Sequence, residues 1–378
     1  MHHFIFPKQD SWISSGSSHI DGTSFKDQNF GQDEILEVKK EFFNFTLDYP
    51  TRALIQFDLS EISNSIDKGD ISRPTLNGNP TGSKFYLKLY EAEGNKELST
   101  EYTLAALPIS QSWDEGRGKF GDNPKVTNGV SWENRDYPDN GNAVTWSNSD
   151  GSNNYGVSTT INHEWNATQS FSYESPDIEM DVTNIVLNWL SGSINNYGFL
   201  LKFSGSQETD ETTFGHLKFF SSNTHTIYAP KLEVRWDDSI SSFDTGALIP
   251  ITSSGLVQNY LSMPNLKDSY KEDDKIKFRV KPRKQYIKKS FTRSVLNETG
   301  SYIGKGSGSY SIIDVATGDT IVPFSAYTSM SCDATSNYFT QWMNGFYPDR
   351  VYKIIYKLKS SDGQEEIFDN NFEFKVKR

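Results

Sequence analysis

Residues 112–176 contain the side chains of this chain that are best suited to holding a ligand, because aromatic rings there alternate with Gly, Asn, Ser and Asp. The apolar face of a sugar ring stacks on an aromatic ring, while nearby Asn and Asp side chains hydrogen-bond its hydroxyl groups. Polar residues flank Trp146 and Trp165, so we expect these two rings to be exposed. The candidate glycan-binding residues are Trp113, Trp146, Tyr155 and Trp165. Alternatively, such rings anchor long loops onto a domain and fill small cores of their own.

A second chemical feature is the segment 275–293, which holds nine Lys and Arg and no Asp or Glu. A positive ridge of this kind is suited to docking on an acidic partner, such as the N-terminal domain of a neighbouring copy. Alternatively, it is the solvated face of one strand, which also deters edge pairing. Nucleic acid is not the expected partner, because a net charge of −12 opposes its approach. The candidate docking residues are Lys281, Arg283, Lys284, Lys288, Lys289 and Arg293.

Catalytic chemistry finds little support in the residue pattern. The six histidines show no zinc-type spacing, and neither a Gly-x-Ser-x-Gly elbow nor a Walker loop is present. Residues 304–308 are rich in glycine, but they open no helix and are interpreted as a hairpin tip. We therefore expect no enzyme and no cofactor. A structural Ca²⁺ held by loop carboxylates and carbonyls stays open as an alternative, with its ligands and the metal content unassigned.

The elements that must position these residues are mostly strands. Residues 180–202 are the exception, since they combine a short amphipathic helix with a glycine stop and a buried strand. Asp181 or Thr183 can cap the helix, and Ile185, Val186, Trp189 and Leu190 fall on one face. Gly192 then ends it, because glycine tolerates the left-handed conformation.

Composition and charge divide the chain into two β-rich domains. Its 378 residues, with 14% aromatics, 27 Gly and 14 Pro, favour sandwiches or barrels. Residues 1–237 hold 18 Lys and Arg against 33 Asp and Glu, whereas 238–378 hold 19 against 16. We therefore predict a first domain over 1–237, a linker over 238–264 and a second domain over 265–378. The single cysteine excludes a disulfide framework, and no apolar run approaches the length of a membrane span.

The second domain is predicted to be an immunoglobulin-like β-sandwich. Residues 275–281 alternate strictly, with Ile276, Phe278 and Val280 pointing inward. Further strands are predicted over 310–314, 321–324, 352–358 and 367–376, which suits such a sandwich.

The first domain resembles the DNRLRE-type module, a jelly-roll domain classed with carbohydrate-binding modules. The matching stretches, in the order of the family, are residues 10–14, 30–38, 52–60, 84–90, 130–132, 180–202 and 230–234. This resemblance spans roughly residues 4–237. It implies a jelly-roll β-sandwich with one short helix, and it makes sugar binding an expectation.

Two further segments resemble virion proteins of marine tailed bacteriophages. They are residues 112–132, with their Ser-Trp-Asp-Glu-Gly-Arg-Gly start, and residues 310–352, which resemble the immunoglobulin-like modules of those proteins. With no secretory signal at its first residues and one cysteine, the chain is expected to fold in the host cytoplasm.

The resemblance therefore implies a structural component of the neck, tail, baseplate or fibre-attachment region. Its expected partners are other virion proteins, further copies of itself in a symmetric ring and a host surface polysaccharide, without membrane insertion. The alternative is an extracellular carbohydrate-binding adhesin or a non-catalytic polysaccharide-binding subunit. A polysaccharide-degrading enzyme is a third, weaker alternative.

Overall fold

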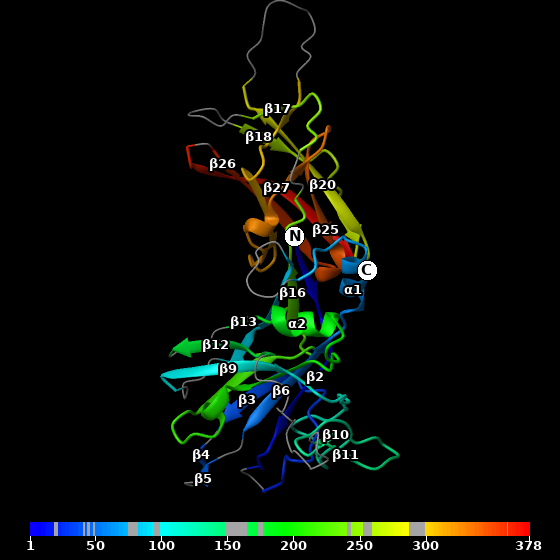
Figure 1. The fold of residues 1–378 in the computed structure, drawn as a ribbon, viewed down its shortest axis with the longest axis vertical. Helices are drawn as coiled ribbons and strands as arrows, with labels where there is room; N and C mark the ends of the chain where they lie inside the picture. Colours follow the sequence, from blue (N-terminus) through cyan, green and yellow to red (C-terminus); the bar gives the residue numbers. More distant parts are fainter. Residues whose placement is uncertain are drawn as a thin grey trace, which may run out of the picture. The chain divides into compact units, whose positions relative to one another are not determined.

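The computed structural model contains two compact units, both built almost entirely from strands (Figure 1). The first unit is Ile5–Val234, and the second unit comprises Met1–Phe4 and Arg235–Arg378. The all-β sandwich class expected from the sequence is confirmed. The structure describes all residues except 19–21, 41, 44–45, 48–49, 75–81, 94–98, 148–164, 173–176, 240–242, 252–258, 287–298 and 361, together with the side chains of 42–43 and 46–47.

A five-stranded antiparallel sheet forms one layer of the first unit. Its order is β12 (Ala167–Ser172), β9 (Glu101–Pro108), β14 (Phe199–Phe203), β6 (Thr51–Phe57) and β2 (Pro7–Ser14). Every residue of β14 is buried, and Ala53, Leu54 and Ile55 of β6 are also buried in succession. Because strand side chains alternate between the two faces, this continuous burial means that both faces of the sheet are covered.

Two smaller sheets belong to the opposite layer of the first unit. One contains β16 (Lys231–Arg235), β7 (Lys84–Leu89) and β13 (Ile178–Asp181), and the other contains β3 (Ile35–Lys40), β15 (Gly215–Phe220) and β8 (Glu91–Glu93). Strand β3 contacts β2, β6 and β14, which places its sheet across one face of the five-stranded sheet. Short two-stranded ladders complete the unit, β4 (Phe42–Phe43) with β5 (Thr46–Leu47) and β10 (Asn134–Asp136) with β11 (Val144–Thr145).

The helix predicted after residue 180 is α2 (Thr183–Leu190), and Ile185, Val186 and Trp189 are buried on one face as expected. Val182 occupies the cap position itself, while the Asp181 carboxylate accepts a hydrogen bond from the Thr183 N–H at 3.0 Å. Gly192 follows the helix with a φ of +74°, which confirms it as the stop.

The expectation of a single helix is wrong, because a second one, α1 (Ser60–Asp67), follows β6. The Asp58 carboxylate accepts a hydrogen bond from the Ser60 N–H at 2.9 Å, and Ile62 is buried. Gly69 lies beyond the helix end with a φ of +80°. These are ordinary helix-boundary features, but Ile62 and Ile66 alone give too short an apolar period to predict a helix.

The second unit is a two-sheet sandwich with the strand order of an immunoglobulin domain. One sheet runs β18 (Asn259–Ser262), β20 (Lys275–Lys284), β25 (Asn337–Trp342) and β24 (Ser331–Cys332), which corresponds to strands A, B, E and D. The other runs β19 (Ser269–Lys271), β27 (Glu365–Lys377), β26 (Val351–Lys359), β22 (Gly308–Asp314) and β23 (Thr320–Val322). In this sheet β27, β26 and β22 take the places of strands G, F and C. The described elements also include three short strands, β1 (His2–Ile5), β17 (Ile249–Pro250) and β21 (Ser301–Tyr302). Three 3₁₀ turns are described as well, at Gly205–Glu208, Ala326–Thr328 and Met343–Gly345.

Aromatic packing occupies the centre of the second unit. The rings of Tyr310 and Phe339 stack with centroids 3.8 Å apart, and Phe278 lies 5.2 Å from Phe339. Tyr352 lies near the start of strand β26, and its hydroxyl accepts a hydrogen bond from the Tyr347 N–H at 2.9 Å, the arrangement of an immunoglobulin tyrosine corner. Buried rings and this corner therefore join the two sheets in a chain whose only cysteine is free.

The predicted domain limits need two changes. Met1–Phe4 belong to the second unit, although the sequence placed residues 1–237 in the first domain. Strands β17 and β18 lie within 238–264, so this segment is an integral part of the second sandwich and not a separate linker. Its Ser, Gly and Pro content suggested a linker because edge strands this short show too little alternation to be recognised.

Candidate functional site

The aromatic rings predicted to bind a glycan are largely occupied in packing. Trp146 is fully buried and Trp113 is 7% exposed, so the expected exposure of Trp146 is wrong. Both pack with Ile13, Leu54 and Leu200 against the face of the five-stranded sheet opposite to β3. The indole N–H of Trp113 donates to the Tyr197 carbonyl at 2.8 Å, and that of Trp146 donates to the Ser131 carbonyl at 3.0 Å. These rings anchor a long segment, which was the alternative interpretation.

The other two candidates give no assembled site. Trp165 is partly buried and precedes β12, whereas Tyr155 lies outside the described residues. The polar neighbours of Trp146 suggested exposure because a sequence pattern does not show which residues will cover a side chain.

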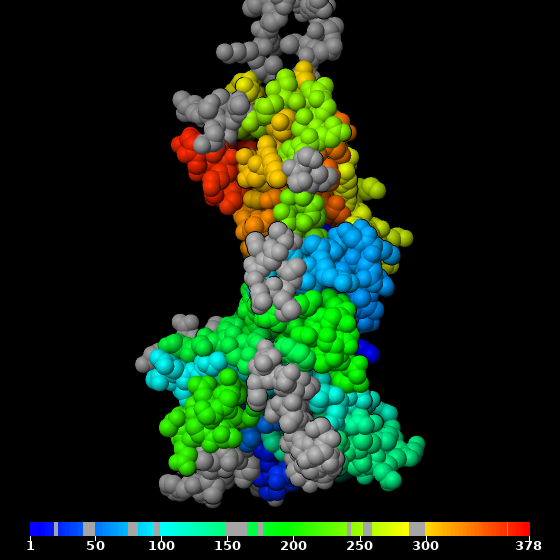
Figure 2. Space-filling view, viewed as in Figure 1, coloured from blue at the N-terminus to red at the C-terminus, as the bar shows by residue number. Residues whose placement is uncertain are grey.

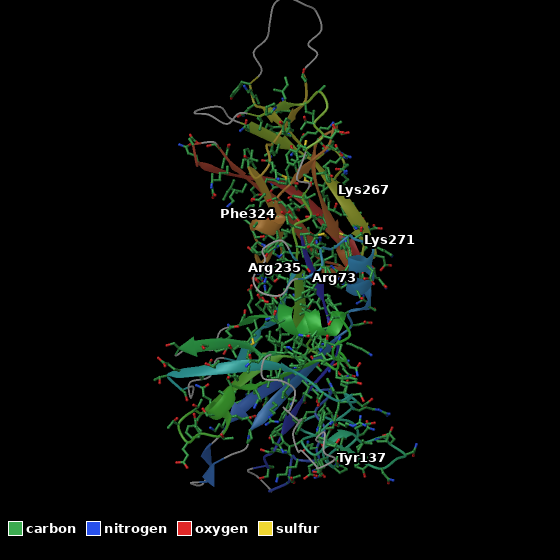
Figure 3. All side chains as sticks on the ribbon, in the orientation of Figure 1. Arg73, Tyr137, Arg235, Lys267, Lys271 and Phe324 are labelled. Atoms are coloured by element: carbon green, nitrogen blue, oxygen red, sulfur yellow. The ribbon has the colours of Figure 1, made fainter. Side chains whose placement is uncertain are left out.

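Asn29 fixes the anchored segment 110–147 to the rest of the first unit. Its buried side-chain amide donates to the Glu115 carbonyl at 2.7 Å and the Val130 carbonyl at 2.8 Å. Its oxygen accepts from the N–H groups of Gly31 at 3.1 Å and Gly118 at 2.7 Å, so all of these bonding positions are used. The backbone carbonyl of Tyr137, a residue labelled in Figure 3, accepts a hydrogen bond from the Gly129 N–H at 3.1 Å. In Figure 2 the teal residues of the segment form a lobe on the surface.

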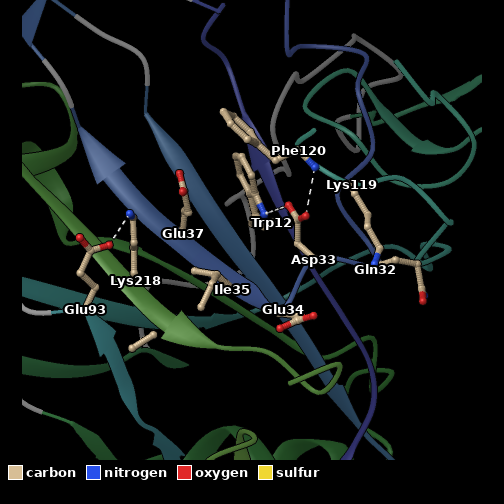
Figure 4. Close-up of a pocket in the computed structure, with 11 residues that line it drawn as sticks. Trp12, Gln32, Asp33, Glu34, Ile35, Glu37, Glu93, Lys119, Phe120 and Lys218 are labelled. Carbon is tan, nitrogen blue, oxygen red and sulfur yellow. Dashed lines mark hydrogen bonds and ion pairs between the residues drawn. The ribbon is translucent and has the colours of Figure 1, made fainter. Parts of the chain in front are cut away.

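A pocket of about 420 Å³ opens beside this segment, between residues that are far apart in the sequence (Figure 4). Phe120 contributes an aromatic ring that is 54% exposed. Beneath it, Trp12 stacks on Phe30 with centroids 3.7 Å apart. The remaining lining residues are Gln32, Asp33, Glu34, Ile35, Glu37, Ala92, Glu93, Lys119 and Lys218. The pocket therefore combines an accessible ring with polar and charged groups, and its size suits a small molecule or one protruding side chain.

Asp33 lies at the base of this pocket. Its carboxylate accepts hydrogen bonds from the Trp12 indole at 2.9 Å and the Phe120 backbone N–H at 3.0 Å. Burial nevertheless raises the pKa of Asp33 to about 6. Glu37 adds to this rise in the pKa of Asp33 through its negative charge, whereas Lys119 opposes it. The negative charge at Asp33 is therefore incompletely compensated by the protein.

Four other charged groups of the pocket, Glu34, Glu37, Glu93 and Lys218, each lie close to a partner group. Lys218 lies 2.5 Å from Glu93, and Glu37 lies 3.3 Å from Lys39 and 3.2 Å from the His216 ring. Burial disfavours the charged form of Glu37, but His216 and Lys39 outweigh this effect and lower its pKa. Glu34, with a side chain 53% exposed, lies 3.6 Å from the His225 ring. Four carboxylates and two ammonium groups thus line the pocket.

Two further carboxylates with raised pKa values lie in the network around these loops. Asp10 is buried and accepts hydrogen bonds from the Ser222 N–H at 2.6 Å and the Ser222 hydroxyl at 2.8 Å. Its own N–H donates to the Glu115 carboxylate at 3.0 Å. Burial raises the pKa of Asp10 to about 6 and that of Glu115 to about 7, the latter also through the charge of Asp10.

The basic run lies on the outer face of the second unit. Strand β20 pairs with β25 through residues 275–280 and with β18 through residues 281–284. Arg279 contacts both carboxylate oxygens of Asp333 at 2.9 Å, and the Lys277 ammonium lies 3.0 Å from the same carboxylate. The bond from Arg279 is the main cause that lowers the pKa of Asp333. At this end of the strand, Arg279 and Lys277 therefore share one carboxylate of the same unit.

The other end of β20 has a different environment. Lys281, Arg283 and Lys284 are exposed, and none of them has an ion pair among the parts of the chain that the structure describes. The Arg283 guanidinium lies 4.7 Å from the ring centroid of Tyr260, which is itself 43% exposed. We call Lys281, Arg283, Lys284 and Tyr260 the cationic end. The remaining docking candidates, Lys288, Lys289 and Arg293, lie outside the described residues.

Among the described residues, no group of three or more His, Cys, Asp or Glu is placed to hold a metal ion. The sequence analysis missed Phe120 and its carboxylate neighbours, although the Gly118 and Gly121 positions around Phe120 were a signal that a turn presents this ring.

Comparisons with known proteins leave the chain without a family assignment. No protein-family model matches it, and no curated protein has a matching sequence. In the described parts, no helix is long and apolar enough to cross a membrane.

Proposed function

We propose that this chain is a structural component of a tailed bacteriophage particle, acting by protein–protein docking in the neck, tail, baseplate or fibre-attachment region. The observation that carries the docking role is the cationic end, where the exposed cations Lys281 and Arg283 share one sheet face with the exposed Tyr260 ring, and Lys284 adds a third exposed cation at the end of the strand. Arg and Tyr are enriched at the centres of protein interfaces because they supply both contact area and hydrogen bonds. The assignment to a phage particle rests on the sequence resemblance.

The two β-sandwiches suit this role physically. Both have large buried cores, and the second is closed by packed rings and a tyrosine corner, in a chain whose single cysteine forms no disulfide. Rigid domains of this kind present a fixed surface, which lowers the entropy cost of forming an interface.

Immunogold labelling of particles from the source material tests the location. Antibody against the chain should label one locus on tailed particles, at the neck, shaft or baseplate. Gold on cell envelopes or free matrix with unlabelled particles would discard the virion proposal and favour an adhesin.

Charge reversal at the cationic end tests the docking role. The double variant Lys281→Glu/Arg283→Glu should weaken association with the partner or with itself at least tenfold at low salt, and less at high salt because ions screen the attraction. Sedimentation velocity at two salt concentrations measures this change.

The matched control is Lys267→Glu/Lys271→Glu, two exposed lysines near β19 that are labelled in Figure 3. It changes the net charge by the same amount on the same unit, and association should be retained. Equal weakening by both double variants would mean that net charge, and not the cationic end, controls association.

The alternative function is a carbohydrate-binding adhesin or non-catalytic subunit. With Trp146 and Trp113 buried, Trp165 is the remaining described ring among the original candidates. This alternative predicts tryptophan quenching on titration with polysaccharide and loss of that quenching in Trp165→Ala.

A further inference from the structure

The Phe120 pocket and the cationic end have complementary chemistry. The pocket offers an exposed ring and four carboxylates, Asp33, Glu34, Glu37 and Glu93, against the ammonium groups of Lys119 and Lys218. A guanidinium is attracted both to the face of an aromatic ring and to carboxylates. The pocket is therefore suited to receiving the tip of an Arg or Lys side chain.

The cationic end presents such side chains on a rigid support. Residues 281–284 of β20 are paired with β18, and Arg283 lies opposite Tyr260. The Tyr260 ring supports the Arg283 guanidinium, so less side-chain freedom is lost when a partner binds it. Lys281 and Lys284 add positive charge on the same short stretch.

The complementarity extends to the two units. Residues 5–234 hold 17 Lys and Arg against 32 Asp and Glu, a net charge of −15. The second unit holds 20 against 17, a net charge of +3. Opposite charges of this kind steer two copies into encounters between unlike units, and like units repel.

We propose that copies of this chain associate head to tail, with the cationic end of one copy seated in the Phe120 pocket of the next. This inference rests on the proposed docking function and names its partner as a second copy. The interface is heterologous, because the two surfaces differ, and it closes into a ring if the rotation between copies permits. Arg283 would lie over the Phe120 ring, and Glu34, whose side chain is 53% exposed, is an accessible carboxylate of the same pocket.

Other occupants fit the pocket less well. An anionic ligand would meet four carboxylates against two ammonium groups. A neutral oligosaccharide could use the ring and the Gln32 amide, but it would add no positive charge to a pocket in which four carboxylates face two ammonium groups. A cation at this position supplies that charge.

A mixing experiment tests head-to-tail docking directly. One variant, Lys281→Glu/Arg283→Glu, lacks the cationic end but keeps the pocket. The other, Glu34→Lys/Phe120→Ala, lacks the pocket but keeps the cationic end. Each variant alone should self-associate at least tenfold more weakly than the parent, because each interface needs both surfaces.

Mixed in equal amounts, the two variants should form a one-to-one dimer and nothing larger, because only one intact interface is possible. Sedimentation velocity and mass photometry of the full chain measure this species, and circular dichroism confirms that each variant is folded. Trp12 lines the pocket, and its ring centroid lies 6.1 Å from that of Phe120. The fluorescence of Trp12 should therefore change in the mixture and in the parent assembly.

The outcomes separate this inference from the proposed function. If only the cationic-end variant loses association, the docking function stands and the pocket is not its partner. If neither variant affects association, both proposals fail. If the pocket variant associates normally and the parent instead binds a neutral oligosaccharide with a Trp12 fluorescence change, the pocket is a sugar site and the head-to-tail inference is overturned.

Discussion

At the scale of single residues, Asn29 shows how one buried amide holds separate chain segments together. Its four hydrogen bonds join the segment after residue 25 to Glu115, Gly118 and Val130. Asn29→Ala would leave two N–H groups and two carbonyls without these partners, and each buried unsatisfied group costs about 1–3 kcal/mol. We expect the free energy of unfolding of the first unit to fall by about 3 kcal/mol in urea titrations.

Asn195→Ala is the matched control, because Asn195 is exposed and donates one bond to the Tyr197 hydroxyl at 3.2 Å. Its unfolding midpoint should stay close to that of the parent. An equal loss in the two variants would show that Asn29 does not hold the segment.

At the scale of elements, two glycines allow the cost of a left-handed backbone to be distinguished from the cost of a steric clash. Gly192 after α2 has a φ of +74° with open space around it. Gly198 before β14 has a φ of +95°, and a Cβ there would meet the Ile55 carbonyl oxygen of β6 at 2.4 Å. Gly192→Ala should cost about 1 kcal/mol from the left-handed backbone alone. Gly198→Ala should cost at least about 2 kcal/mol more, because β14 must also move away from β6.

Chemical denaturation of both glycine variants measures the difference between these two costs. Equal costs would show that the approach of β14 to β6 relaxes without penalty. The comparison therefore tests the strand contact and not the glycine conformation, which the two positions share.

At the scale of the whole molecule, buried titratable groups make stability depend on pH, and the sign of each contribution follows from the direction of its pKa shift. The pKa values of Asp10, Asp33 and Glu115 are raised to about 6–7 in the folded first unit, against about 4 in unfolded chains. Between these values the folded state binds more protons, so this contribution to stability is lost as the pH rises from about 4 to 7. Burial lowers the pKa of His3 in the second unit to about 4, so its contribution grows as the pH rises from about 4 to 6.5.

Calorimetry of the full chain at pH 5 and pH 7.5 tests these signs through variants. Glu115→Gln removes a charge that burial disfavours, so it should raise the free energy of unfolding of the first unit relative to the parent. This increase should be about 1 kcal/mol larger at pH 7.5 than at pH 5. The control Glu101→Gln alters an exposed side chain of β9 and should show a smaller pH-dependent difference. A larger gain at pH 5 than at pH 7.5 for Glu115→Gln would contradict the raised pKa.

Features that repeat along the chain could be predicted from the sequence. The alternation in residues 275–281 placed Phe278 and Val280 inward, and both are buried in β20. The apolar spacing after residue 182 and the glycine at 192 located α2 and its end. The charge difference between the two halves also follows from composition alone, and it persists in the two structural units. Helix α1 was missed because it buries only two side chains, whereas α2, which has the same length, buries four.

The sequence by itself therefore determined the all-β class, the main helix and the charge of each half, because backbone periodicity and composition are local or additive properties. Only the tertiary structure decided which rings are free. Trp146 is buried by residues from distant strands, while Phe120 is exposed at a pocket that also uses residues 12, 32–37, 92–93 and 218. The raised pKa of Asp33 arises in the same way, because desolvation depends on neighbours that the fold brings together over long distances in the chain.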